Sequence, residues 1–428
     1  MLAEIILPVV IILVGLALFL NAPIYIAILA AAFYLQIFVN GMPLQNIFTG
    51  LFEALTKNSL LAVPFFIVAG NFIAASSLGT RLINLFIACL KNVRAGLSIS
   101  CLLANAVFGA ISGSPPAATA TFGKIIYDPL EKAHGQKLAL GLITSAGALS
   151  SIIPPSIIMI IYGIATDTSV AQLFMGGFLP GLVVVLIIGI YLFFRCKTSA
   201  FTGEPTSAAE IKKAFWRGIP VLVLPVLILG GIYGGIFTPT EAGAVAAAYS
   251  AVVGVLFLKD ITLSQVLDLL KDSARTTGQI FILIASSVVF AQAATISQLP
   301  HHLTTFFSSF DDVQFLLFLN ILLLLVGCFF EPSAAILILA PLLLPAAKHL
   351  GIDPLHLGIV FTVNLAIGMF TPPFGLNIFV SQSILKKSMG EISSGVLPFI
   401  VLYILALCVI TYVPSLSLVL PRLLYGIS

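Results

Sequence analysis

Long apolar runs recur along the whole chain and are separated by short polar stretches. Residues 5–20, 173–194, 219–237 and 396–413 are examples that contain no Asp, Glu, Lys or Arg. As helices, such runs are long enough to cross about 30 Å of hydrocarbon. Their apolar residues are continuous, whereas transmembrane β-strands alternate apolar and polar residues. The pattern therefore predicts an all-α integral membrane protein.

The longest hydrophilic stretch divides the chain into two nearly equal halves that share a spacing of prolines. Pro154-Pro155 in the first half recurs as Pro372-Pro373 in the second, 218 positions later. Pro115 precedes the first pair by 39 positions, and Pro332 precedes the second by 40. Such internal similarity is typical of transporters built from structural repeats. We expect repeats at residues 1–194 and 218–428, joined by a cytoplasmic linker at residues 195–217.

Each half is predicted to contain a re-entrant helical hairpin followed by a broken helix. Pro115 lies between two apolar runs that are too short to span separately, and Pro332 is its counterpart. A proline pair removes two backbone donors and clashes with the preceding turn, so a helix breaks there. The expected hairpins cover about residues 100–127 and 314–348, and the broken helices cover about residues 138–166 and 356–385.

The distribution of basic residues indicates how the two repeats are oriented. With the linker in the cytoplasm, 16 of the 19 Lys and Arg residues fall on that side, and only Lys57, Lys348 and Arg422 fall outside. Such a bias is expected of cytoplasmic loops. In this trace the first hairpin opens to the cytoplasm and the second to the outside. The repeats are therefore predicted to be inverted.

The first hairpin tip is predicted to line a polar site, because unwound backbone at membrane depth is tolerated only inside protein or beside a polar cavity. Pro115 suits the first turn of the returning half-helix, whose N-terminus favours an anion. The carbonyl groups that end the incoming half-helix can coordinate a cation such as Na⁺. The alternative is an ordinary proline kink in a continuous span. Candidates for a first Na⁺ site are Ser112, Gly113, Ser114, Gly147, Ser150, Ser151 and Pro154.

At the second tip a carboxylate stands directly before the proline. A Glu within a membrane is a candidate cation ligand or proton carrier, and Glu331 also suits the N-cap of the helix that Pro332 begins. Candidates for a second Na⁺ site are Gly327, Glu331, Asn364, Gly368, Thr371 and Pro372. Ser, Thr, Asn and Gly residues also mediate ordinary helix packing in membranes, which is the alternative for each of them.

A carboxylate substrate is expected to bind between the two tips. Candidates for this site are Ser114, Pro115, Ser156, Pro332, Ser333 and Asn377. Asp167 could face the substrate, but it lies near the outer boundary of the trace, which favours a solvated loop residue. Thr238 and Glu241 flank Pro239 with the spacing of a capping box, so a helix is predicted to begin there.

Composition narrows the possible functions. The chain of 428 residues is 60% hydrophobic and 8% charged, with a mean hydropathy of +1.18, and so has too little polar surface for a soluble globule. A net charge of +3, spread along the chain, gives no support for nucleic-acid binding. The sequence contains no ATP-binding loop, nucleophile elbow or zinc-protease helix. We therefore predict a transporter rather than an enzyme, driven by an ion gradient if transport is uphill.

Five motifs, taken in order, resemble the large membrane subunit of the tripartite ATP-independent periplasmic (TRAP) transporters. The resemblance spans essentially the whole chain. The motifs are residues 109–115 (GAISGSP), 153–156 (IPPS), 237–242 (FTPTEA), 331–332 (EP) and 370–373 (FTPP).

This resemblance implies a Na⁺-driven secondary transporter of the elevator type, in which a transport domain slides against a scaffold in a bacterial inner membrane. It also implies two separate partner chains, a small four-helix membrane subunit and a soluble periplasmic substrate-binding protein. The family's substrates are carboxylates such as C4-dicarboxylates and sialic acid, and overall similarity favours sialic acid, with another sugar acid possible. Two alternatives remain: a stand-alone anion:Na⁺ symporter of the same architecture, and a channel-like membrane subunit.

Overall fold

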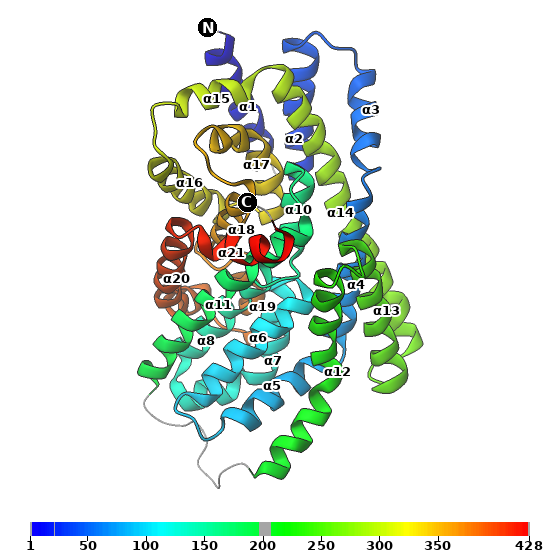
Figure 1. The fold of residues 1–428 in the computed structure, drawn as a ribbon, viewed down its shortest axis with the longest axis vertical. Coiled ribbons are helices and arrows are strands. Elements are labelled where there is room, and N and C mark those ends of the chain that lie inside the picture. The colour runs from blue at the N-terminus through cyan, green and yellow to red at the C-terminus, as the bar shows by residue number, and fades with distance from the viewer. Residues whose placement is uncertain (1, 21, 197–206, 427–428) are drawn as a thin grey trace.

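A computed structural model describes residues 2–20, 22–196 and 207–426 (Figure 1). These residues form helices and connecting loops, with no β-strand among them. Within this part of the chain, seven helices are long and apolar enough to cross a membrane, or eight if one bent pair counts as a single span. The sequence prediction of an all-helical, multi-pass membrane protein is confirmed at this level.

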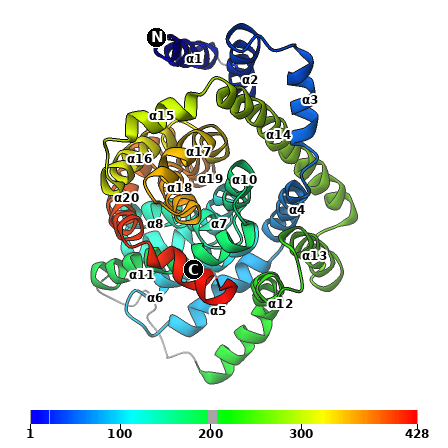
Figure 2. The ribbon, with the colours of Figure 1, turned by 45° about the horizontal axis from the view of Figure 1, so that its top comes forward.

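One set of helices forms an arc along one side of the molecule (Figure 2). Its members are α1 (Leu2–Phe19), α2 (Ile24–Phe33) with the π-helix η1 (Tyr34–Val39), α3 (Gln45–Ala54), the 3-10 helix η2 (Asn58–Leu61) with α4 (Ala62–Ala75), α12 (Ala208–Tyr233), α13 (Pro239–Val252) with the π-helix η3 (Val253–Phe257), and α14 (Leu263–Ile296). Neighbours pack in the order α1, α2, α14, α4, α13 and α12, while α3 lies along α14. We call this set the arc.

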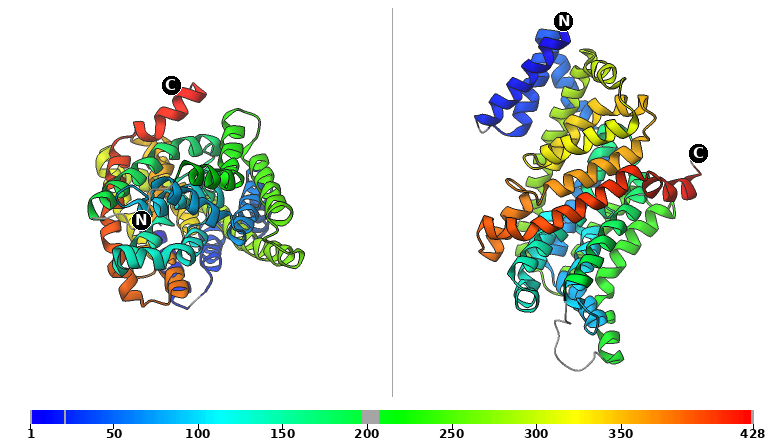
Figure 3. Two further views of the ribbon diagram at one scale, coloured as in Figure 1. Left: turned by 90° about the horizontal axis from the view of Figure 1, so that it is seen from below. Right: turned by 90° about the vertical axis from the view of Figure 1, so that its left-hand side faces the viewer.

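A second group of helices packs beside the arc, and we call it the body. It contains α6 (Gly96–Ser112), α7 (Pro115–His134), α8 (Gln136–Ala146), α9 (Leu149–Ile152), α10 (Ile157–Thr166), α11 (Val170–Arg195), α15 (Leu299–Phe307), α16 (Asp312–Gly327), α17 (Pro332–His349), α18 (Pro354–Gly368), α19 (Leu376–Leu385), α20 (Met389–Tyr412) and α21 (Ser415–Tyr425). Helix α5 (Leu78–Leu90) connects α4 of the arc to α6 and packs against α12. Figure 3 shows the N-terminal helices at one end of the molecule and α21 projecting from its side.

Several helices begin at capping boxes, as their sequences indicate. At the start of α13, the Thr238 hydroxyl accepts a hydrogen bond from the Glu241 N–H at 3.3 Å, and the Glu241 carboxylate accepts one from the Thr238 N–H at 2.8 Å. The capping box predicted there is therefore confirmed. Equivalent boxes begin α12, α14, α16 and α20. These reciprocal bonds satisfy backbone donors that a helix leaves free at its first turn.

Two helix pairs in the body have the form of hairpins. Helices α6 and α7 pack against each other and are joined by Gly113 and Ser114, and α16 and α17 are joined by residues 328–331. Each hairpin is followed by helices interrupted at a proline pair: α8 and α9 meet α10 at a bend of 40°, and α18 ends before α19. The two prolyl bonds Pro154-Pro155 and Pro372-Pro373 are both cis.

The centre of the body is formed by the helices that lead into the two breaks. Helix α18 is buried along its length from Leu355 to Gly368, and α8 is buried from Ala139 to Ala146. The packing around them is reciprocal between the halves: α10 contacts α17, and α19 contacts α7. Ser151 and Met369, which are 218 positions apart, contact each other with 4.0 Å between Oγ and Sδ.

The described part of the expected linker, residues 195–196 and 207–217, is mostly helical. Helix α11 continues to Arg195, and α12 begins at Ala208, so most of the described linker residues belong to a helix. The Ser207–Glu210 capping box explains this early start, because it satisfies the first turn before the apolar run begins. Residues 197–206 of the expected linker lie outside the described residues.

Candidate functional site

The first hairpin tip is a two-residue connection between helices. Gly113 ends α6 in the left-handed region with a φ of +56°, and its N–H donates to the Gly109 carbonyl at 2.9 Å. Ser114 is the N-cap of α7, because its hydroxyl accepts a hydrogen bond from the Ala117 N–H at 3.4 Å. Since α6 and α7 pack side by side, this segment is not an ordinary kink in a continuous helix.

This tip lies against the first helix break. A Cβ atom at Gly109 would lie 2.6 Å from the Cα of Ser150, so α6 approaches the backbone of α9 closely. A Cβ atom at Gly147 would lie 3.0 Å from the carbonyl oxygen of Pro115 and would clash with the side chain of Thr119. The structure therefore brings Gly147 and Ser150 next to the tip that carries Ser112, Gly113 and Ser114.

Three buried hydroxyl groups around this tip have no hydrogen-bond partner among the described residues. They belong to Thr119, Ser150 and Ser156. A buried polar group without a partner costs free energy, so its presence in a packed region indicates a ligand, an ion or water. Thr119 was missed by the sequence analysis, although it lies one helical turn after Pro115 and so shares its face of α7. Ser151 instead contacts Met369, and Pro154 lies buried at the bend.

The second tip also lies against its helix break. A Cβ atom at Gly327 would lie 3.2 Å from the Cα of Gly368, and a Cβ atom at Gly368 would clash with the backbone of Gly327. This close approach joins the ends of α16 and α18. Gly327 and Gly368 follow Gly109 and Ser150 by 218 positions each, so the same contact occurs at matching places in the two halves.

Asn364 is fully buried one turn before Gly368. Its amide donates to the Oδ1 of Asn320 at 2.7 Å and to the Val360 carbonyl at 2.9 Å, while its own Oδ1 has no partner among the described residues. Thr371 donates its hydroxyl proton to the Ile367 carbonyl at 2.7 Å, which leaves lone pairs of its oxygen available. Asn320 was missed by the sequence analysis because a lone Asn in an apolar helix resembles ordinary packing.

Glu331 stands directly before Pro332 at the start of α17. The residue has an exposed surface, although the hydrogen bonds of its carboxylate are partly buried. One carboxylate oxygen accepts a hydrogen bond from the Ser333 hydroxyl at 2.8 Å, and the other accepts one from the Ala334 N–H at 3.3 Å. Glu331 is therefore the N-cap of α17, and its hydrogen bonds do not join it to Asn364 or Thr371. Pro372 lies partly buried at the second break.

The expected substrate residues are spread over both tips and both breaks. Pro115 and Pro332 begin α7 and α17, while Ser333 is bonded to Glu331. Asn377 is buried in α19, donates its amide to the Thr144 carbonyl of α8 at 3.2 Å, and leaves its Oδ1 without a partner among the described residues. Asn377 thus links the second break to the first half of the chain.

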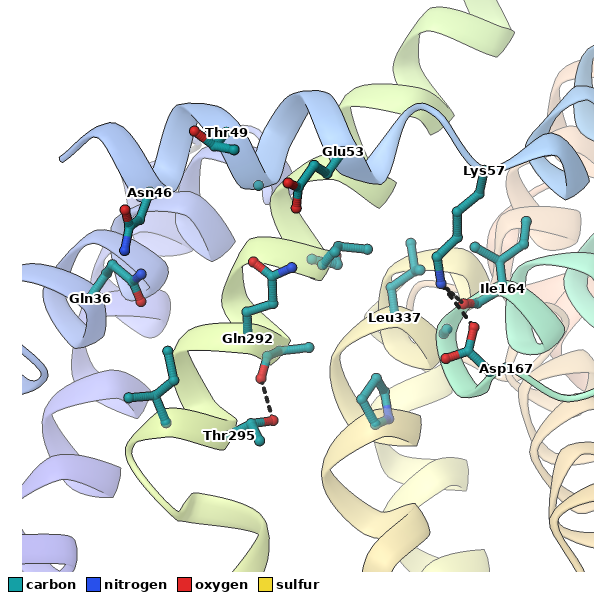
Figure 4. A pocket seen from close by; sticks show the side chains of 17 residues that line it. Gln36, Asn46, Thr49, Glu53, Lys57, Ile164, Asp167, Gln292, Thr295 and Leu337 are labelled. Atoms are coloured by element: carbon teal, nitrogen blue, oxygen red, sulfur yellow. Dashed lines mark hydrogen bonds and ion pairs between the residues drawn. The ribbon is translucent and has the colours of Figure 1, made fainter. Parts of the chain in front are cut away.

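A separate polar cavity lies between the arc and the body, as Figure 4 shows. Its volume is about 590 Å³, and its walls come from η1, α3 and α14 on one side and from α10 and α17 on the other. Gln36, only 5% exposed, has an Oε1 atom with no partner among the described residues, and the same holds for the Ser287 hydroxyl. Unpartnered polar atoms therefore lie on residues that line the cavity.

One ion pair crosses this interface (Figure 4). The Lys57 ammonium lies 2.9 Å from a carboxylate oxygen of Asp167, and it also donates to the Ile164 carbonyl at 3.4 Å. The side chain of Asp167 is 85% exposed, which agrees with a solvated residue at the end of α10. Its partner could not be identified from sequence because the two residues are 110 positions apart.

Comparison with known proteins places these features in a family. The family model of the tripartite ATP-independent periplasmic transporter, DctM component, matches residues 9–416. The chain is 40% identical over 380 residues to a C4-dicarboxylate TRAP transporter large permease of Pseudomonas aeruginosa, covering 87% of the chain and 88% of the relative. It is 30% identical over 413 residues to the sialic acid TRAP transporter large permease of Vibrio cholerae, covering 96% of the chain and 97% of that relative.

Solved structures of two other transporters share the fold. The YdaH transporter of Alcanivorax borkumensis matches with a TM-score of 0.58 at 16% identity, covering 90% of this chain and 89% of that one. MtrF of Neisseria gonorrhoeae matches with a TM-score of 0.59 at 12% identity, covering 86% and 83% of the two chains. At these identities the similarity concerns the fold alone.

Proposed function

The chain belongs to the DctM component family of the tripartite ATP-independent periplasmic transporters, and from that premise we propose that it is the translocating subunit of a Na⁺-driven importer of an organic acid. The observation that carries the Na⁺ proposal is the pair of matching contacts between a hairpin tip and a helix break. Each contact has buried oxygen atoms without partners nearby, from Ser150 and Thr119 in the first half and from Asn364 in the second.

The residues at both places suit a hard cation. Na⁺, like other hard cations, is bound by carbonyl, hydroxyl and amide oxygens, and broken helices in transporters supply such carbonyl groups. The first proposed site contains Ser112, Gly113, Ser114, Gly147, Ser150, Ser151 and Pro154, with Thr119 added. The second contains Gly327, Glu331, Asn364, Gly368, Thr371 and Pro372. Glycine at the tips allows two backbones to approach closely enough to share one ion.

We propose that the two halves are inverted repeats and that the body moves against the arc as an elevator. The reciprocal contacts of α10 with α17 and of α19 with α7 support the repeat, because exchanging the halves reproduces the same arrangement. The polar cavity supports movement at the interface, since a tightly packed apolar seam would resist sliding. The exposed ion pair between Lys57 and Asp167 adds a weak, breakable link across it.

The substrate is proposed to bind between the tips, where the N-terminus of α7, capped by the neutral Ser114, favours an anion. Ser114, Pro115, Ser156, Pro332, Ser333 and Asn377 remain the proposed contacts. The relatives carry names for different substrates, including C4-dicarboxylates and sialic acid. Because identity is higher to the C4-dicarboxylate permease than to the sialic acid permease, a C4-dicarboxylate is the first substrate to assay and sialic acid the second.

Two partners and a location complete the proposal. We propose that a small four-helix membrane subunit and a periplasmic substrate-binding protein act with this chain in a bacterial inner membrane. The basis is the family, which is described as a tripartite periplasmic transporter with this chain's family as one component.

Uptake by reconstituted vesicles tests this proposal. Vesicles containing the chain and its small subunit, with substrate-loaded binding protein outside, should accumulate substrate only under an inward Na⁺ gradient. Accumulation that is unaffected by Na⁺ would contradict the proposed coupling. Accumulation without the binding protein would favour a stand-alone symporter, and dissipation of the gradient without accumulation would favour a channel.

A further inference from the structure

A basic pocket of about 480 Å³ lies between α5 and α12, at a different place from the hairpin tips. It is lined by Ser77, Thr80, Arg81 and Asn84 on one side and by Glu210, Lys213, Ala214 and Arg217 on the other. Both sets follow the spacing i, i+3, i+4 and i+7, which marks a single face of a helix. One polar face of α5 therefore lies opposite one polar face of α12.

The pocket carries an excess of positive charge. It contains three cations and one carboxylate, and in the described part of the chain no ion pair within 4.0 Å joins these cations to an acidic group. The Glu210 carboxylate is used as a helix cap, since it accepts from the Ser207 N–H at 3.1 Å. At the pocket's edge, Asp260 accepts from the Ser77 N–H at 2.8 Å. Arg81 donates to the Ser77 hydroxyl at 3.0 Å, and none of the three cations has an ion-pair partner among the described residues.

The surroundings of the pocket are those of a membrane surface. Helix α12 is a candidate span from Ala208 to Tyr233, and the pocket lies in its first three turns. Phe215 and Trp216, beside the pocket on α12, have exposed side chains. Trp side chains concentrate at both membrane–water interfaces, and Lys and Arg residues concentrate on the cytoplasmic side.

We infer that this pocket binds the phosphate headgroup of an anionic phospholipid from the surrounding membrane. Arg81, Lys213 and Arg217 contact the phosphate, and Thr80 and Asn84 are positioned to donate hydrogen bonds. The exposed aromatic side chains beside the pocket contact the acyl chains. Basic pockets between spans on the cytoplasmic side suit such headgroups. Helix α5 connects the arc to the first hairpin, so a lipid bound between α5 and α12 stabilises the packing of these two helices. Its phosphate also reduces the electrostatic repulsion between the three cations.

Native mass spectrometry of the purified full-length chain tests this inference. The probe is phosphatidylglycerol, with phosphatidylcholine as the neutral comparison. The double variant Lys213→Gln/Arg217→Gln should bind phosphatidylglycerol roughly 25-fold more weakly, because each basic residue near an anionic lipid contributes about a fivefold factor. The matched control is Lys132→Gln/Lys212→Gln, which removes the same charge from exposed residues outside the pocket lining and should bind as the natural chain does.

Each outcome decides for or against the inference. The headgroup site is supported if the Lys213→Gln/Arg217→Gln variant loses phosphatidylglycerol binding while its melting temperature in phosphatidylcholine stays unchanged. It is also supported if the Lys213→Arg variant still binds phosphatidylglycerol. Equal binding by the pocket variant and the control overturns it. Displacement of the lipid by millimolar inorganic phosphate also overturns it, because the pocket would then bind a soluble anion rather than a membrane lipid.

Discussion

Replacing Asp167 with Asn removes the negative partner of Lys57 while keeping the size of the side chain. The ion pair is short, at 2.9 Å, but its side chains are 38% and 85% exposed, so water screens the charges. Exposed pairs of this kind contribute about 0.2–1 kcal/mol. If the pair forms only when the arc and body are in the present arrangement, its loss should reduce the population of that arrangement relative to others by between about 1.4-fold and 5-fold.

Pulsed electron resonance between spin labels at Phe52 and Lys348 can measure this population in a cysteine-free background. Both positions are exposed, one on the arc and one on the body. The variants Asp167→Asn and Lys57→Gln should shift the distance distribution in the same direction, and the double variant should shift it by no more than either alone. Asp312→Asn is the matched control, because Asp312 is an exposed carboxylate without an ion pair to a described residue. A population change of more than tenfold would refute the reasoning. So would distance distributions that shift in opposite directions in the two single variants.

Three further predictions concern the tips and one helix start. Alanine in place of Ser114, Asn364 or Glu331 should abolish Na⁺-dependent uptake without loss of expression; normal uptake in all three would show that the tips do not form the sites. Gly109→Ala should lower stability by about 1–3 kcal/mol in thermal unfolding, because the new Cβ would lie 2.6 Å from the Cα of Ser150, whereas Gly390→Ala adds its Cβ in open space and should not. Equal melting temperatures of the Gly109→Ala and Gly390→Ala variants would contradict the close packing of α6 on α9. Thr238→Ala should cost about 1 kcal/mol by removing the cap of α13, while Thr240→Ala in the same turn, which leaves that cap intact, should cost less.

The prolines made the hairpins and helix breaks predictable from sequence. A proline acts on its own residue and the preceding turn, so its structural effect is local. The first hairpin, expected at about residues 100–127, is formed by α6 and α7 over residues 96–134, and the second, expected at 314–348, is formed over residues 312–349. Capping boxes are equally local, which explains why the start of α13 was identified correctly.

Contacts between distant segments could not be predicted in the same way. The Lys57–Asp167 pair joins residues whose separation depends on the packing of the whole body against the arc. Asn320 accepts a hydrogen bond from Asn364, 44 positions later, and donates one to Thr411, while Thr119 lies against Gly147 on a neighbouring helix. Neither set of contacts is visible in the local sequence. The N-cap role of Glu331, by contrast, was predictable because it depends only on the adjacent Pro332 and the first turn of α17.

Simultaneous measurement of Na⁺ and substrate entry tests the central claim most directly. Vesicles holding the chain and its small subunit would receive radioactive Na⁺ and a labelled C4-dicarboxylate on the binding protein, at zero membrane potential. We predict that both labels enter at a fixed ratio, that neither enters without the other, and that Asn364→Ala loses both fluxes. Substrate entry without Na⁺, or Na⁺ entry that continues without substrate, would contradict coupling at the two tips.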